Sequence, residues 1–176
     1  MKKAFLILAF LLAGFSALAQ ERKIPAYLGG DFGVSIGSGH TSIVVYPEVG
    51  WRVTDNLYAG VQAGFGYYEG SGYSDFSVGI IPHLRYYYYI YQRFGVSAEA
   101  GMRLGLTRRS GNEGLIRSFD VGIRPGLVIP IGARYAVTLQ VGFLGYESDR
   151  YGDVVDGHWG FRLQSNDFRV GFLLNL

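Results

Sequence analysis

Eight segments of this chain alternate between apolar and polar residues, and one face of every segment carries no charge. In one of them, Phe119, Val121 and Ile123 share a face, while Asp120 and Arg124 share the opposite one. Successive side chains of a strand point to opposite faces of a sheet, so this period of two predicts strands. An uncharged face that recurs in all eight segments must meet an apolar medium, which is either a protein core or lipid.

The lengths of the segments favour lipid. They run about 10 to 15 residues, which exceeds the usual strand of a globular domain and is enough for a tilted strand to cross a bilayer. No stretch shows a sustained helical period, so the chain is predicted to be all-β. The segments begin near Ala26, Thr41, Leu57, Phe76, Phe94, Phe119, Tyr135 and Phe168, and the last ends at Leu176.

The connections between segments support the same conclusion. Short turns (TDN, YQR and PIGAR) alternate with longer polar stretches, namely EGSGYSD, TRRSGNEGLIR and the run from Glu147 to Gly160. Outer-membrane barrels have short periplasmic turns and longer external loops. We therefore predict a closed eight-stranded antiparallel up-and-down transmembrane β-barrel. A soluble lipocalin-like barrel, the rival fold, would place its apolar face inside and its charges outside.

The N-terminus has the pattern of a secretory signal peptide. MKKAFLILAFLLAGFSALAQ combines two lysines, an apolar run and small residues around Ala19, and such segments are removed on export. We expect residues 1–19 to be the signal peptide and residues 20–176 to form one barrel domain. Without Lys2 and Lys3 the chain carries 14 basic and 14 acidic residues, so no nucleic acid partner is expected. With no cysteine, no disulfide can hold the domain together.

The charged face of the segments predicts a polar lumen. An eight-stranded barrel is just wide enough for side chains to fill, so we expect its charges to pair with one another and to plug it. In HLRYYYYIYQRF, Tyr86 and Tyr88 should face lipid, while Tyr87, Tyr89 and Tyr91 should face the lumen and offer hydroxyls to arginines. The predicted structural charge network consists of Asp31, Glu48, Arg52, Arg85, Glu99, Arg103, Asp120, Arg124 and Arg169.

Three functions are compatible with this design. The first is a non-enzymatic outer-membrane protein with a structural role or with surface interactions through its external loops. The second is a narrow diffusion pore lined by Arg52, Arg85, Arg103 and Arg124. The third is a lipid A-modifying enzyme at the outer rim, in which a serine, a histidine and an acid would combine. Its candidates are His40 beside Ser38 and Ser42, and His158 beside Asp153 and Asp156, whereas His83 belongs to the lumen.

No motif for a cofactor or a metal stands out. The acidic run ESDRYGDVVDGH does not have the alternate spacing of an EF-hand loop, and no helix follows the glycine-rich stretches. We therefore expect no cofactor, no metal site and no catalytic residue.

Two irregularities interrupt the alternation. Pro47, Pro82 and Pro125 fall inside three of the segments, and because proline cannot donate to a sheet ladder, we expect local bulges there. Between Phe161 and Asp167 the alternation slips by one residue. A bulge near Ser165 and Asn166 would repair it, or else the last strand begins only near Asp167.

From Asp31 to Leu176 the chain resembles the small outer-membrane β-barrel proteins of Bacteroidetes, related in architecture to the OmpA/OmpX-type barrels. The likeness is carried by YPEVGWRVTDNLYAGVQAGFGY, PHLRYYYY and FDVGIRPGLVIPIGARYAVTLQVGFLGY. Such barrels more often end in Phe than in a residue like Leu176. The resemblance implies an integral protein of the outer membrane with both termini in the periplasm, in contact with outer-membrane lipid and, during biogenesis, with the barrel assembly machinery.

Overall fold

The computed structural model describes residues 25–37, 39–70, 72–91, 94–110, 114–163 and 168–176, which form an antiparallel sheet closed into a barrel. The proposed signal peptide lies outside these residues. No helix in the described part of the chain is long and apolar enough to cross a membrane. The strands are β1 (Ala26–Gly37), β2 (His40–Arg52), β3 (Leu57–Gly70), β4 (Tyr73–Tyr91), β5 (Phe94–Arg109), β6 (Leu115–Pro130), β7 (Tyr135–Gln140), β8 (Phe143–Tyr151), β9 (Val154–Arg162) and β10 (Arg169–Asn175).

The predicted eight-stranded barrel is confirmed. We call each full-length strand position of the barrel wall a stave, and the seventh and eighth staves each consist of two shorter strands. From β1 to β6 every strand pairs with the next one. Strand β6 then pairs with β7 over one half of its length and with β8 over the other, so β7 and β8 together make the seventh stave. Strands β9 and β10 make the eighth, and β10 closes the barrel by pairing with both β7 and β1.

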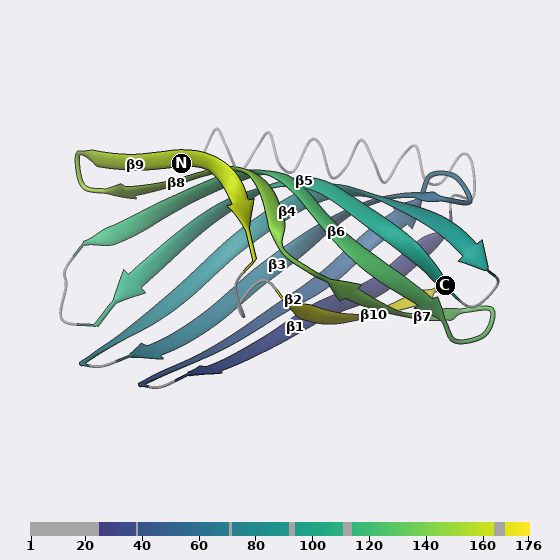
Figure 1. Cartoon of the computed structure of the whole chain (residues 1–176), viewed down its shortest axis with the longest axis horizontal. Helices are drawn as coiled ribbons and strands as arrows, with labels where there is room; N and C mark the ends of the chain where they lie inside the picture. Colours follow the sequence, from purple (N-terminus) through teal and green to yellow (C-terminus); the bar gives the residue numbers. More distant parts are fainter. Residues whose placement is uncertain (1–24, 38, 71, 92–93, 111–113, 164–167) are drawn as a thin grey trace.

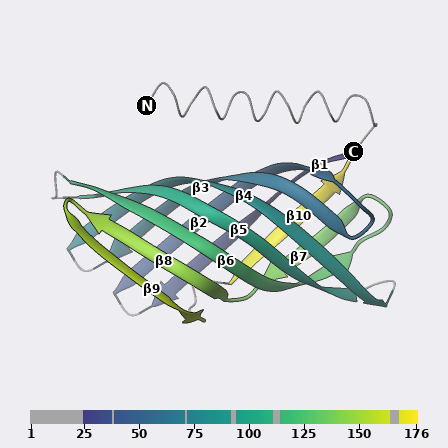
Figure 2. The ribbon, with the colours of Figure 1, turned by 90° about the horizontal axis from the view of Figure 1, so that it is seen from above.

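The barrel has two distinct ends, and the strands run between them at a steep tilt (Figures 1 and 2). We call the end with the turns at residues 54–56 and 131–134 the turn end. The first and last described residues also lie there, where Leu176 donates a backbone hydrogen bond to Ala26. The opposite end, with the β8–β9 hairpin, is called the loop end. At this end, and within the described residues, β9 is paired with β8 alone.

The alternation predicted from the sequence sets the two sides of the wall. Apolar side chains such as Phe32, Val45, Leu104 and Phe172 are exposed on the outside of the barrel. The chain has 16 basic and 14 acidic residues, but these do not cover the apolar exterior. In the tyrosine-rich part of β4, Tyr86 and Tyr88 are exposed while Tyr87 is buried, as expected. A contiguous apolar exterior of this extent is stable only against another apolar phase, so the barrel is built to sit in lipid.

The prediction of long polar loops was wrong for EGSGYSD and for the run from Glu147 to Gly160, whereas the middle of TRRSGNEGLIR lies outside the described residues. Gly37 pairs with His40, Gly70 with Tyr73 and Tyr151 with Val154, so three of the loop-end connections are two-residue hairpin tips. The stretches interpreted as loops continue the strands: β4 begins at Tyr73, and the run 147–160 is mostly the β8–β9 hairpin. Polar residues appear there because both faces of a strand meet water once it leaves the lipid.

The expected bulges at the prolines were largely wrong as well. Pro47 and Pro82 interrupt the pairing to one neighbour but leave the register unchanged on both sides. A one-residue slip does occur opposite Pro125, in the seventh stave, where Gly126 pairs with Gln140 but Ile123 pairs with Leu144. Gly142 takes a φ of 75° there, which glycine adopts without strain. The Val141 N–H donates to the Pro125 carbonyl at 2.9 Å.

This bulge reverses the alternation of the seventh stave. In the sequence Phe143 has the parity of Leu139 and Val141, which predicts that it faces lipid, but it is buried in the lumen and Leu144 is exposed in its place. Tyr146 has the parity of Thr138 and Gln140, which predicts that it faces the lumen, but it pairs with outward-facing Val121. In the eighth stave, Leu163 and Phe168 are both exposed although they differ in parity. The bulge predicted at Ser165 and Asn166 lies outside the described residues.

Candidate functional site: the filled lumen

The lumen is the part of the barrel where chemistry-bearing side chains converge. Because the strands alternate, every second residue of each one points to the barrel axis. The inner face contributes polar residues from β1, β2, β3, β4, β5, β6, β7 and β10. Those that are almost fully buried include Asp31, Glu48, Gln62, His83, Arg85, Glu99, Asp120, Arg124, Thr138, Gln140 and Arg169.

Arg85 is the centre of the charge network. Its side chain is 1% exposed and its Nε donates to Glu99 Oε2 at 3.0 Å. Its Nη2 donates to Glu99 Oε2 at 2.5 Å and to Glu48 Oε2 at 2.9 Å. Its Nη1 donates to the Tyr87 hydroxyl at 3.4 Å, and Asp31 lies 3.8 Å from Nη2. One guanidinium thus holds carboxylates from three strands.

Neutral side chains complete the coordination of these carboxylates. The Gln62 amide donates to both Asp31 and Glu48, at 2.8 Å in each case. Glu48 Oε1 accepts from the Tyr27 hydroxyl at 2.5 Å and lies 3.0 Å from His83 Nε2. A buried ion pair is stable only when its remaining lone pairs are satisfied, and Glu48 meets that condition on both oxygens.

Two further arginines balance the charge of the network. Arg124 lies 3.9 Å from Glu99, and its guanidinium stacks over the Phe143 ring at 4.8 Å. Arg169 stacks over the Tyr46 ring at 4.0 Å, while its Nε and Nη1 have no hydrogen-bond partner among the described residues. Asp31, Glu48 and Glu99 therefore face Arg85, Arg124 and Arg169. Phe143 can provide its ring to Arg124 only because the bulge turns it inward.

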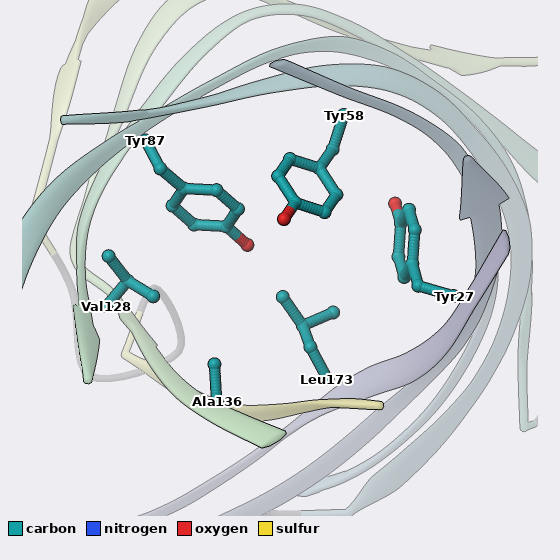
Figure 3. Close-up of a cluster of buried hydrophobic side chains, with 6 residues drawn as sticks. All are labelled: Tyr27, Tyr58, Tyr87, Val128, Ala136 and Leu173. Carbon is teal, nitrogen blue, oxygen red and sulfur yellow. The ribbon is translucent and has the colours of Figure 1, made fainter. Parts of the chain in front are cut away.

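A layer of aromatic and aliphatic side chains fills the lumen on the turn-end side (Figure 3). The Tyr27 and Tyr58 rings meet edge to face at 5.5 Å between centroids, and the Tyr58 and Tyr87 rings do so at 5.0 Å. Figure 3 shows the three rings pointing toward the axis from different strands. The layer is completed by Val128, Ala136 and Leu173.

On its loop-end side the lumen is lined by smaller side chains than on its turn-end side and contains a cavity. Small residues there, among them Gly64, Ser77, Gly105 and Ser118, line a cavity with Arg103 and Tyr46. Arg103 Nε lies 2.5 Å from Asp120, although the pair is off the direction of a hydrogen bond. A polar cleft that shares Arg103 with this cavity contains the ion pair of Glu147 with Arg162 and the cross-strand pair of Asp149 with Asp156. The barrel is thus filled in its middle and at its turn end, and is more open toward its loop end.

The structure brings most of the predicted site residues together. Asp31, Glu48, Arg85, Glu99, Arg124 and Arg169 form the central network, and Arg103 with Asp120 forms a second pair. Arg52 is apart from both, because it lies at the turn-end rim beside Tyr58. The sequence prediction did not include Tyr27, Gln62 or Gln140 in the network. Their parity in β1, β3 and β7 was the signal that could have found them.

The two histidine groups considered for catalysis are placed on strands. The His40 ring stacks against Tyr68 at 6.1 Å, with Ser42 buried nearby on β2, and Ser38 lies outside the described residues. His158 is on β9, not in a loop, and its exposed imidazole lies 3.8 Å from Glu147. His83 is in the lumen as predicted, where its Nδ1 lies 3.2 Å from the Ile81 carbonyl.

No family model matches the chain, and no curated protein matches it in sequence at a significant level. Among solved structures it is similar to Neisserial surface protein A, with 12% sequence identity and a TM-score of 0.54 over 87% of this chain and 96% of that one. It also matches the outer membrane enzyme PagL, with 15% identity and a TM-score of 0.46 over 85% of this chain and 99% of PagL. A third match is a major outer membrane protein from Thermus thermophilus, with 13% identity and a TM-score of 0.39 over 86% of this chain and 99% of that one.

At such low identity, the likeness to Neisserial surface protein A concerns the fold alone. That fold is the eight-stranded outer-membrane β-barrel, which agrees with the antiparallel closure, the apolar exterior and the polar lumen described above.

Proposed function

We propose that this chain is an integral protein of the outer membrane, with a plugged lumen and without enzymatic activity, whose role is structural or depends on contacts made at its loop end. The signal peptide at residues 1–19 would direct it to the periplasm, where the barrel assembly machinery would insert it into outer-membrane lipid. The resemblance to the Bacteroidetes and OmpA/OmpX-type barrels remains part of this proposal. Both termini would lie in the periplasm, because the first and last described residues share the turn end.

The observation that carries the proposal is the filling of the lumen at mid-height. Arg85 and Glu99 are each 1% exposed and Gln62 is fully buried, so side chains occupy the section through which a permeant ion would pass. Directly toward the turn end, the layer around Tyr58 and Tyr87 adds a second obstruction. A pore needs a continuous wet path, and these two layers stand across it.

Conductance in a planar lipid bilayer tests the plug. We expect the refolded chain 20–176 to insert without steady current steps. The matched control combines Arg85→Ser and Glu99→Ser, which removes a complete ion pair, with Tyr58→Ala and Tyr87→Ala. This variant should conduct, which shows that the assay detects an opened barrel. Salt-dependent steps from the wild-type chain would instead support the narrow diffusion pore.

The orientation can be tested because the chain contains no cysteine. Asp153 at the β8–β9 tip and Asp55 in the β2–β3 turn are both exposed and lie at opposite ends of the barrel. On intact cells, a membrane-impermeant maleimide should label Asp153→Cys and not Asp55→Cys, while both should react after the cells are opened. Labelling of Asp55→Cys alone would reverse the proposed orientation.

Surface contacts at the loop end would be made by paired strands rather than by long loops. Strand β9 of the β8–β9 hairpin is exposed along almost its whole length and carries Asp156 and Trp159, and Asp153 lies at the exposed tip. A paired hairpin loses less conformational entropy on binding than an irregular loop of the same length. Deletion of residues 148–157 with retention of the folded barrel should abolish binding of a surface partner and leave the bilayer insertion unchanged.

A further inference from the structure

The outer wall carries a row of arginines near the loop end. Arg108 on β5, Arg117 on β6 and Arg150 on β8 are all exposed and lie on the outward face of their strands. Arg117 pairs directly with Arg150 across β6 and β8, and with Leu106 across β5 and β6. Arg108 pairs with Leu115, which makes it the diagonal neighbour of Arg117. We call these three residues the outer arginine row.

The row places like charges side by side. Residues directly opposite in an antiparallel pair have Cβ atoms about 5 Å apart, and like charges in that position are destabilising. No acidic side chain within ion-pair distance of Arg108 or Arg117 is found among the described residues. Arg150 donates from Nε to the Gly152 carbonyl at 3.1 Å, which leaves its charge uncompensated. By contrast, the adjacent inward-facing Arg109 has a two-point ion pair with Asp75.

The row also lies at the edge of the apolar belt. The outward apolar run of β6 extends from Phe119 to Ile129. At a rise of about 3.3 Å per residue and a tilt of about 40°, this run covers about 25 Å of height, the height of the lipid-facing band of such barrels. Arg117 is the next outward residue beyond Phe119, so the row stands at the depth of lipid headgroups.

Below the row, the wall is hollowed into an apolar groove. Leu104, Leu106, Phe119 and Val155 line it together with Arg117 and Arg150. A groove with aliphatic walls and guanidinium groups at its upper edge matches a molecule with hydrocarbon chains and an anionic headgroup. Guanidinium groups recognise phosphate through paired hydrogen bonds, so phosphate is the headgroup chemistry that suits three of them.

We propose that Arg108, Arg117 and Arg150 bind the phosphate groups of a membrane lipid whose acyl chains occupy the groove against Leu106 and Phe119. This inference rests on the proposed membrane location, and the proposed orientation makes the lipid one of the outer leaflet, such as lipid A. The bound phosphates would provide the negative charge that the protein itself does not supply to the row.

Native mass spectrometry of the refolded chain in detergent tests the proposal. The probes are bis-phosphorylated lipid A and the same lipid after removal of both phosphates. We expect the wild-type protein to retain the phosphorylated lipid at about tenfold lower concentration or less, since each charge-assisted hydrogen bond contributes on that scale. Inorganic phosphate at the same ionic strength should not displace it. Equal retention of the two lipids would overturn the proposal.

Variants locate the site. Arg117→Gln should weaken retention of phosphorylated lipid A about tenfold, and the triple variant Arg108→Gln, Arg117→Gln, Arg150→Gln should reduce it to the level of the dephosphorylated lipid. Arg134→Gln, which removes the same charge at the turn end, should match the wild type. Wild-type retention by a folded triple variant would refute the site. The comparison of the two lipids on the wild-type chain decides the question if the triple variant does not fold. Failure of the proposed function would appear separately, as absence of bilayer insertion.

Discussion

Replacing Arg85 with methionine tests whether the lumen network stabilises the barrel. Methionine keeps a long unbranched chain but removes the guanidinium that donates to Glu99 at 3.0 and 2.5 Å and to Glu48 at 2.9 Å. Both carboxylates are almost fully buried, so the variant leaves negative charge without its nearest counterion. Breaking a buried ion pair in this way costs about 3 to 5 kcal/mol. We expect the free energy of unfolding to fall by that amount.

A double-mutant cycle with Glu99→Gln separates the pair from its surroundings. Glu99→Gln alone should cost less, about 1 to 3 kcal/mol, because Arg85 retains Glu48 at 2.9 Å and Asp31 at 3.8 Å. The double variant removes one charge of each sign and keeps the lumen neutral. Its cost should be smaller than the sum of the single costs by about 0.5 to 3 kcal/mol, the usual coupling of residues in one network.

The assay is equilibrium urea unfolding in phosphocholine vesicles, followed by the fluorescence of Trp51 and Trp159, with the folded band on unheated gels as a second readout. Arg134→Met is the control, because Arg134 lies in the exposed turn before β7, where a substitution changes stability by about 0.5 kcal/mol or less. If Arg85→Met unfolds within about 1 kcal/mol of the wild type, the carboxylates are solvated. The lumen would then be wet, and the reasoning from a dry plug would be refuted.

Three further pairs of substitutions, each a test and its control, probe the wall, the bulge and the network. Ile123→Arg, near the middle of the apolar belt, should cost about 2 to 4 kcal/mol in the same unfolding assay, and Ile131→Arg at the turn end about 0 to 1 kcal/mol; equal costs would contradict a lipid-facing wall. Gly142→Ala should cost about 1 to 3 kcal/mol, because its φ is 75° and a Cβ would lie 2.9 Å from the Arg162 carbonyl. Gly132→Ala, with a φ of 86° but open space around it, should cost less, and the reverse order would show that the bulge is not tightly packed. Tyr27→Phe, which removes the hydroxyl bound to Glu48, should cost about 1.5 to 3 kcal/mol, whereas Tyr86→Phe on the outer wall should be neutral, and equal effects would place Tyr27 outside the network.

The side of the wall that a residue faces could be predicted from the sequence wherever the period of two is unbroken. Arg85, Tyr86 and Tyr87 are placed as their parity requires. The prediction failed at Phe143 because one extra residue in the seventh stave shifts every later residue to the other face. Such a bulge depends on the pairing with Pro125 on the neighbouring strand, which the sequence of the seventh stave alone does not contain.

The ends of the strands could not be predicted, for a different reason. Within the lipid the two faces of a strand meet opposite solvents, so the alternation marks it clearly. Beyond the lipid both faces meet water, and residues such as Asp149, Asp153 and Asp156 have the composition of a loop. The β8–β9 hairpin is nevertheless fully paired from Phe143 and Arg162 to its tip. Backbone pairing therefore extends beyond the part of each strand in which apolar and polar residues alternate.

The central network could be predicted as a set but not as a geometry. Parity places Asp31, Glu48, Arg85 and Glu99 in one lumen, whereas their contacts depend on register. Arg85 lies beside Glu99, and Glu99 beside Arg124, because β4, β5 and β6 pair in one particular alignment. A shift by two residues would keep every charge inside and would break each of these pairs.

The same register explains why the inner face is so rich in glycine. Gly171 lies directly beside Asp31 on one neighbouring strand and beside Thr138 on the other, and a Cβ at Gly171 would overlap both side chains. A Cβ at Gly60 would likewise overlap the Tyr27 hydroxyl that binds Glu48. In a barrel whose interior is only just wide enough for side chains, an arginine, a tyrosine or an aspartate can reach the axis only if a neighbouring position has no side chain of its own. The glycines at positions 60 and 171 therefore leave room for the side chains of the charge network. A larger residue at either position would displace a member of that network.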